Sequence, residues 1–157
     1  MATYPDSLLI LNGKSASNDI LRQAVVDLRE DGAHIHVRLT WEKGDAARYV
    51  AEGVQLGVNT IISGGGDGTI NEIATAPIGL NVDTRPVMGI LPLGTANDFA
   101  RSTGIPVDDL TAALRLSLCT TARQIDIVDI DEHRNRVLPP LCPEQFHDLH
   151  RGLRIKG

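Results

Sequence analysis

The residues with the clearest potential for chemistry form one glycine-rich run at positions 63–72, with the sequence SGGGDGTINE. The run follows an apolar segment that ends at Ile62 and precedes residues that can begin a helix. Because glycine lacks a Cβ atom, backbone N–H groups here could converge on a phosphate, and the following helix N-terminus would add partial positive charge. A plain strand-to-helix turn needs only one or two glycines, whereas this run has four glycines around one Asp. The run therefore predicts a phosphate-binding loop for a nucleotide, in preference to a simple packing turn.

Two familiar nucleotide-binding fingerprints do not fit the chain. A dinucleotide loop of the form G-x-G-x-x-G would need glycine where the chain has Thr69 or Asn71. The GKS sequence at 13–15 is like the end of a P-loop, but the first glycine of that motif would fall on Leu8. The motifs therefore exclude a Rossmann dehydrogenase and a Walker-type ATPase.

A second run, PLGTANDFAR at positions 92–101, follows the apolar segment at 87–91. Together the two runs match G-G-D-G-T-x-N-E and P-x-G-T-x-N-D-x-A-R, the marks of the diacylglycerol kinase catalytic domain shared by bacterial lipid kinases, sphingosine kinases and ceramide kinases. The chain resembles this family over residues 5–128. LLILNGKS at 8–15 and TWEKGDA at 40–46 are similar to the YegS-type lipid kinases in particular.

The resemblance implies that this part of the chain binds ATP, with Mg²⁺ as the accompanying metal ion. It implies ATP contacts for Thr40, for residues 66–72 and for Thr95, and the glycine run extends the expected site to Gly64. The expected ATP-binding residues are Thr40, Gly64, Gly65, Gly66, Asp67, Gly68, Thr69, Ile70, Asn71, Glu72 and Thr95. We expect no resident metal site built from the chain's own residues.

Individual side chains in this expected site have both a functional and a structural interpretation. Asp67 is the expected catalytic residue, as a catalytic or magnesium-linked carboxylate near the terminal phosphate, and its alternative is a turn-stabilising hydrogen bond. Thr40, Thr69 and Thr95 could bind the nucleotide or cap a helix. Glu72 could line the ATP site or act as a capping-box-like residue.

The elements that must position these residues alternate along the chain. Strands are expected at 7–11, 35–39, through Ile62 and through Leu91, with helices beginning near Asn18 and Gly44, after the glycine run and around Leu110. This alternation predicts βαβ units and right-handed crossovers. The fold class is therefore α/β, an open and mostly parallel Rossmann-like sheet, of the type that the resemblance assigns to phosphofructokinases, NAD kinases and lipid kinases. Ligands bind at the carboxyl ends of such strands. Asn12 and Lys14 also fall there and are weaker candidates for contacts with the nucleotide.

The pattern weakens after Ile127. We expect an ATP-binding domain at 1–130 and an irregular or disordered tail at 131–157, because the tail is rich in charge and interrupted by prolines. Resembling kinases continue into a larger β-rich second domain, which we expect to be absent from this chain. His133, Cys142, His147 and His150 lie in the tail without a second ligand pair at standard spacing, so a zinc site is not expected.

The composition limits the classes of molecule that the chain is expected to bind. The chain has 157 residues and a net charge of −5, which disfavours non-specific attraction to nucleic acid or to an anionic membrane. No apolar stretch approaches the roughly 20 residues that span a bilayer, and the N-terminus does not have the pattern of a signal peptide. We therefore expect a cytoplasmic protein that meets a lipid substrate peripherally, at the membrane surface.

The predicted function is a lipid kinase that transfers a phosphoryl group from Mg-ATP to phosphatidylglycerol or a diacylglycerol-like lipid. In resembling kinases the general base and the metal carboxylates lie in the second domain, so this chain is expected to be the ATP-binding part and to be inactive by itself. Two alternatives stay open: a catalytically incompetent nucleotide-binding fragment, and a soluble enzyme like NAD kinase, which shares the G-G-D-G loop.

Overall fold

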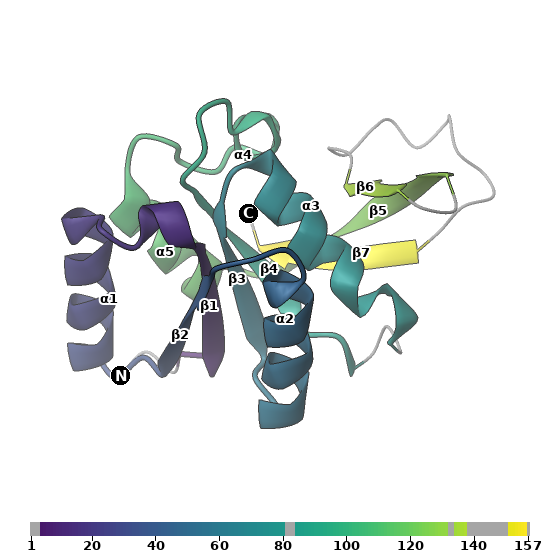
Figure 1. Ribbon diagram of the computed structural model, residues 1–157. Coiled ribbons are helices and arrows are strands. Elements are labelled where there is room, and N and C mark those ends of the chain that lie inside the picture. The colour runs from purple at the N-terminus through teal and green to yellow at the C-terminus, as the bar shows by residue number, and fades with distance from the viewer. Residues whose placement is uncertain (1–3, 81–83, 132–133, 138–150, 157) are drawn as a thin grey trace.

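In the computed structural model, which describes residues 4–80, 84–131, 134–137 and 151–156, seven strands form one sheet (Figure 1). The strands are β1 (Ser7–Asn12), β2 (Ile35–Thr40), β3 (Thr60–Gly65), β4 (Val87–Pro92), β5 (Ala122–Asp131), β6 (Arg134–Val137) and β7 (Arg151–Lys156). Their order across the sheet is β2-β1-β3-β4-β7-β5-β6.

The first four strands of the sheet are parallel and end together. Asn12 of β1 is in register with Thr40 of β2, and Gly65 of β3 is in register with Pro92 of β4. The carboxyl ends of all four strands therefore meet at one edge of the sheet. This arrangement confirms the predicted Rossmann-like α/β fold.

Helices cover both faces of this parallel half (Figure 1). The helices are α1 (Asp19–Glu30), α2 (Asp45–Leu56), α3 (Asp67–Thr75), α4 (Asp98–Ser102) and α5 (Leu110–Cys119), with 3-10 turns η1 (Gly13–Ser15) and η2 (Ala76–Gly79). α1 packs beside α5 on one face, and α2 packs beside α3 on the other. Two-sided coverage buries the central strands, which explains why they are continuous apolar runs in the sequence.

The helix ends follow the signals in the sequence. Asn18 caps α1, because its Oδ1 accepts a hydrogen bond from the Leu21 amide at 3.0 Å. α2 begins after Gly44 and ends at Gly57, and both glycines have left-handed backbone angles, with φ values of 95° and 73°. Left-handed angles of this kind favour glycine, so these two positions set the length of α2.

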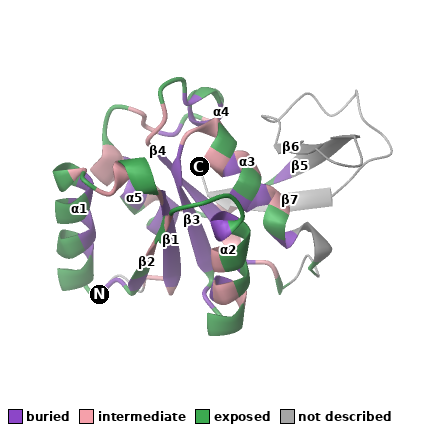
Figure 2. Ribbon diagram, viewed as in Figure 1, coloured by how far each residue is buried: buried purple, intermediate pink, exposed green. Residues whose placement is uncertain are grey.

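The core lies between the sheet and the two helix layers (Figure 2). Leu8, Leu9 and Ile10 of β1 and Ile62 of β3 have no exposed surface. Strand β2 forms one edge of the sheet, and its residues after Ile35 are exposed or only partly covered. β1, β3 and β4 are therefore almost fully buried, and the candidate site lies at the carboxyl ends of these strands.

Helix α5 is tied directly to β4, the strand that leads into the second motif. The Ser117 hydroxyl accepts a hydrogen bond from the Ile90 amide at 3.1 Å and donates one to the Ile90 carbonyl at 3.2 Å. Gly89 permits this approach, because a Cβ atom there would lie 2.7 Å from the Ser117 Cβ. These contacts hold β4 firmly against the helix layer.

The prediction of an irregular segment after residue 130 is wrong for residues 134–137 and 151–156, which form β6 and β7. β7 pairs parallel with β4, and β5 pairs antiparallel with both β7 and β6. The outer edge of β4 offers unpaired backbone groups, and pairing there stabilises a strand that has only a weak local pattern. His133, Cys142, His147 and His150 lie outside the described residues.

Candidate functional site

The candidate site lies at the carboxyl edge of the sheet, between β1 and β3. These strands are neighbours, but β1 leads toward α1 on one face and β3 leads into α3 on the other. In open α/β sheets this change of direction leaves a crevice in which ligands bind. The glycine-rich run starts at the β3 side of the crevice, and Asn12 and Lys14 lie at its β1 side.

The N-terminus of α3 is open to a ligand. Its N-cap is Gly66, which has no side chain to accept hydrogen bonds from the first turn. The first amide groups of a helix have no partner within the helix, and together with the helix dipole they attract an anion. Gly68 follows in this turn, and a Cβ atom built there would meet no heavy atom within 4 Å. The surface of this turn at Gly68 is therefore not covered by other parts of the described chain.

A groove of about 500 Å³ lies at the same edge of the sheet. Its lining residues are Asn12, Gly13, Lys14, Thr40, Trp41, Glu42, Lys43 and Glu72. The groove brings the predicted ATP-binding residues Thr40 and Glu72 together with Asn12 and Lys14, the weaker candidates. Its size is within the range of about 300–1,000 Å³ that is typical of small-molecule sites.

Two glycines of the run are required by packing within the protein. A Cβ atom at Gly64 would collide with the Leu11 side chain of the neighbouring strand. A Cβ atom at Gly65 would collide with the Thr69 side chain, which lies over the end of β3. The packing interpretation thus accounts for Gly64 and Gly65, whereas Gly68 faces open space.

The loops of the two motifs touch each other. A Cβ atom at Gly66 would lie 3.1 Å from the Gly94 Cα, so the two backbones approach as closely as only glycines allow. Beside this contact the Leu93 amide donates a hydrogen bond to the Gly65 carbonyl at 3.0 Å. Residues about thirty positions apart in the sequence therefore form one surface.

Asp67, the predicted catalytic residue, links the two motifs. Its Oδ2 accepts a hydrogen bond from the Asp98 amide and its Oδ1 accepts one from the Phe99 amide, both at 3.1 Å. The carboxylate thus satisfies the first turn of α4 and offsets the positive end of that helix. α4 is consequently already capped by an anion from within the chain, whereas α3 is not.

Asn97 is a site-building residue that sequence reasoning missed. It has left-handed backbone angles, with φ 53° and ψ 41°, and its side chain is 6% exposed. Its Oδ1 accepts from the Gly94 amide at 2.9 Å, and its Nδ2 donates to the Gly94 carbonyl at 2.8 Å. This reciprocal pair closes the turn that carries the exposed Thr95. Asn adopts left-handed backbone angles more readily than most residue types. This preference is the signal in the sequence that could have identified the turn.

Asp45 was also missed, and it shapes the rim of the groove. Its Oδ2 accepts hydrogen bonds from the amides of Trp41 at 2.7 Å and Glu42 at 3.0 Å, and its Oδ1 pairs with Arg48 at 2.8 Å. The Trp41 amide, followed by the Glu42 amide, lowers the pKa of the Asp45 carboxyl below its ordinary value. Asp45 therefore holds the loop that follows Thr40 in one conformation.

None of the three threonines acts as a helix N-cap. Thr69 is the third residue of α3, Thr40 ends β2, and Thr95 lies in the turn before α4. The N-caps of α2, α3 and α4 are Gly44, Gly66 and Asn97. The capping alternative is therefore wrong for all three, and their hydroxyl groups are available for another role.

The other residues of the run lie within α3. Ile70 is 1% exposed, and its side chain belongs to the core. Asn71 is partly buried, whereas Glu72 is exposed in the second turn, beyond the position of a capping box. Thr95 and the glycines of the run do not line the groove described above; they lie at the ends of β3 and β4 on the same edge.

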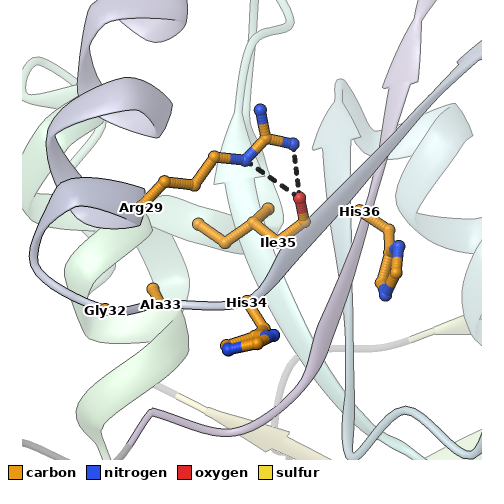
Figure 3. A pocket seen from close by; sticks show the side chains of 6 residues that line it. All are labelled: Arg29, Gly32, Ala33, His34, Ile35 and His36. Atoms are coloured by element: carbon orange, nitrogen blue, oxygen red, sulfur yellow. Dashed lines mark hydrogen bonds between the residues drawn. The ribbon is translucent and has the colours of Figure 1, made fainter.

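A second hollow, of about 370 Å³, lies at the opposite edge of the sheet (Figure 3). The Arg29 Nε donates a hydrogen bond to the Ile35 carbonyl at 3.2 Å, and the side chains of His34 and His36 point in other directions. The three basic groups therefore do not converge on a common ligand. Among the described residues, no group of three or more His, Cys, Asp or Glu is placed to hold a metal ion.

An open α/β sheet with four parallel strands, and with two glycine loops in contact at their carboxyl edge, defines the fold class of this chain. Within this class, the chain belongs to the family of the diacylglycerol kinase catalytic domain, whose model matches residues 6–130. The family resemblance predicted from the two motifs is therefore confirmed.

The similar proteins extend well beyond the length of this chain. Over 132 residues it is 63% identical to the "Probable lipid kinase YegS-like" of Enterobacter sp. (strain 638) and 61% identical to the "Probable lipid kinase YegS" of Escherichia fergusonii. Each alignment covers 84% of this chain and 44% of the relative. A solved structure of a diacylglycerol kinase from Bacillus anthracis str. Sterne matches with a TM-score of 0.67 and 29% identity, over 81% of this chain and 48% of that one. This chain thus spans less than half the length of these proteins.

Within the described ranges, no helix has both the length and the apolar character that crossing a bilayer requires.

Proposed function

We propose that this chain is the ATP-binding part of a lipid kinase, which transfers the terminal phosphoryl group of Mg-ATP to a lipid hydroxyl. The observation that carries the proposal is the uncapped N-terminus of α3, beside a groove of about 500 Å³ at the carboxyl edge of the sheet. The neighbouring helix start, at α4, is already occupied by the Asp67 carboxylate. The start of α3 is therefore open to a nucleotide phosphate, whereas the start of α4 is not.

Each group in the proposed site has a physical task. The amides in the first turn of α3 donate hydrogen bonds to the phosphates, and Lys14 offsets their charge from the β1 side. The hydroxyls of Thr40 and Thr95 approach the nucleotide from the ends of β2 and β4. Asp67, the proposed catalytic residue, connects the phosphate loop to α4 through its two backbone hydrogen bonds.

The described residues fit the nucleotide better than they fit its metal ion. Open amides and a groove of suitable size are present, but the described part of the chain holds no group of three or more acidic or other ligating side chains suited to a metal. We therefore propose that the isolated chain binds ATP without transferring phosphate at a useful rate.

The names of the relatives support a lipid as the acceptor, and phosphatidylglycerol or a diacylglycerol-like lipid is the proposed substrate. We propose that the protein is cytoplasmic and meets this lipid at the membrane surface, as a peripheral protein. Lys14 and Lys43 line the groove with two acidic residues, so the site itself is not strongly basic. Recognition of the lipid is consequently expected to depend on parts beyond this groove.

The proposal is tested by measuring ATP binding and phosphate transfer separately. ATP binding to the 157-residue chain is measured by titration calorimetry in Mg²⁺. Transfer of labelled phosphate is then measured with vesicles of phosphatidylglycerol or diacylglycerol and with NAD, using the full-length Enterobacter relative as the positive control. ATP binding without transfer by the chain, and lipid phosphorylation by the relative, are the expected results.

Three outcomes would contradict parts of the proposal. Absence of ATP binding by the folded chain would remove the nucleotide site. Phosphorylation of NAD in place of lipid would assign the NAD kinase-like alternative. Lipid turnover by the chain at a rate near that of the relative would show that the chemistry resides within these 157 residues.

A further inference from the structure

Trp41 is the most exposed large apolar side chain among the described residues. It is 95% exposed and is the single Trp of the sequence. Trp side chains are highly buried on average, because the indole is large and mostly apolar. An indole that is left in water at the rim of a groove therefore provides a surface that a bound molecule can cover.

The position of Trp41 is set by hydrogen bonds of its own backbone. Its amide donates to the Asp45 carboxylate at 2.7 Å, and the Asp45 side chain is only 3% exposed. On the other side, Thr40 belongs to β2 and is in register with Asn12. The backbone that carries the indole is thus held by a strand end and by a buried carboxylate, so its exposure is a feature of the fold.

The groove that Trp41 lines reaches α3, the helix whose first turn is the proposed phosphate site. Trp41 and Glu72 both line the groove, and Glu72 lies four residues after Gly68 on α3. Residues four apart share one face of a helix and are separated by about 6 Å along its axis. A molecule that binds at the first turn of α3 and lies along this face would reach the groove that Trp41 lines.

We infer that the Trp41 indole stacks on the adenine base of the nucleotide, so that Trp41 contacts the ligand and makes the site select aromatic bases. This inference rests on the proposed function, because it takes ATP as the occupant of the groove. Aromatic side chains stack on the flat faces of nucleic acid bases, with little dependence on the base sequence. The phosphates are bound at α3, and Trp41 supplies the part of the affinity that depends on the base.

A membrane surface is the competing occupant, since Trp is also common at lipid interfaces. The charged residues around the indole argue against it. Lys14 and Lys43 share the groove with Glu42 and Glu72, so charges of both signs surround Trp41. Mixed charges of this kind suit a polar nucleotide better than the edge of a bilayer.

The single Trp makes the inference directly measurable, because any tryptophan fluorescence has one origin. The chain is titrated with Mg-ATP and, separately, with inorganic tripolyphosphate, which has the phosphates but no base. We expect ATP to change the fluorescence of Trp41, and tripolyphosphate to bind without a comparable change. Vesicles of phosphatidylglycerol without ATP are expected to have no effect.

Substitutions of Trp41 test the same inference through the affinity for ATP. Stacking on one base is worth about 5- to 150-fold in binding when the aromatic group is changed to alanine, so Trp41→Ala should weaken ATP binding by that factor. Its affinity for tripolyphosphate should be unchanged, and Trp41→Phe should recover most of the loss. Leu56→Ala is the matched control, since Leu56 is 50% exposed at the far end of α2. Thermal unfolding should be unchanged in all three variants, because both side chains are exposed.

The result separates this inference from the proposed function. If wild-type chain binds ATP, but neither its fluorescence nor the Trp41→Ala affinity changes, the stacking inference is overturned and the nucleotide site stands. If fluorescence responds to vesicles and not to bound ATP, the indole belongs to a membrane contact and the inference is overturned. If the folded chain binds neither ATP nor tripolyphosphate, the proposed function fails as well.

Discussion

Replacing Gly68 by alanine should make the fold more stable and ATP binding weaker, two effects of opposite sign from one methyl group. Gly68 lies in α3, and a Cβ atom there meets no heavy atom within 4 Å, so the protein itself has room for it. Exchanging glycine for alanine at such a position raises the free energy of unfolding by about 0.4–1 kcal/mol. For a chain of this size the melting temperature should rise by about 1–4 °C.

The same methyl group would occupy the space beside the amides of the first turn of α3. Losing one hydrogen bond to a charged group costs about 1.5–3 kcal/mol, which corresponds to a loss of affinity of about 10- to 150-fold. Titration calorimetry with Mg-ATP measures the affinity, and thermal unfolding without nucleotide measures the stability. The two measurements on Gly68→Ala should therefore move in opposite directions.

Gly66→Ala provides the contrast, because its Cβ atom would lie 3.1 Å from the Gly94 Cα. That variant should lose stability and affinity together, since the contact between the two loops is disturbed. The decisive result is the ATP affinity of Gly68→Ala. An unchanged affinity in a variant that is stable and folded would refute the assignment of the α3 N-terminus as the phosphate site.

Three further changes test the elements that build the site. Asp67→Ala removes the acceptor for two amides of α4, and should lower the free energy of unfolding by about 0.5–2 kcal/mol and speed hydrogen exchange at the Phe99 amide; unchanged exchange there would contradict the link. Ser117→Ala leaves the amide and carbonyl of Ile90 without their partner, and should lower the free energy of unfolding in urea by about 1–3 kcal/mol. A loss below about 0.5 kcal/mol, roughly the error of such measurements, would contradict this role. The pKa of Asp45 is lowered in the folded state by the Trp41 amide, so its stabilising effect is full above the unfolded pKa and is lost as pH falls through the folded one. Asp45→Asn should therefore flatten the acid limb of melting temperature against pH, and an equally steep limb would count against this role.

The sequence predicted the parts of the fold whose signals are local. The apolar run at β1 and the glycine run after Ile62 each contain the information for a buried strand and the turn that follows it. Asn18, Gly44 and Gly57 likewise mark helix ends through their own side chains or backbone angles. The order of these elements was sufficient to predict a parallel sheet with a site at its carboxyl edge.

The features that sequence reasoning missed depend on contacts between distant parts of the chain. The sequence around Asp67 does not indicate that its carboxylate oxygens accept hydrogen bonds from the amides of Asp98 and Phe99. Asn97 was read as part of a motif, and its reciprocal bonds to Gly94 follow from a backbone conformation that the sequence does not determine alone. β7 was missed for a similar reason, because the edge of β4 that it pairs with exists only in the folded sheet.

The contact between Gly66 and Gly94 makes the two positions mutually dependent in evolution and in engineering. A side chain at either glycine would press on the backbone of the other, so the first substitution must force the loops apart. Once they are apart, a substitution at the second position finds space already made and costs less than it would alone. Effects of neighbouring residues that share one contact are commonly non-additive by about 0.5–3 kcal/mol. The two signatures of this chain are therefore one epistatic unit, and a variant of one loop is best judged together with its counterpart in the other.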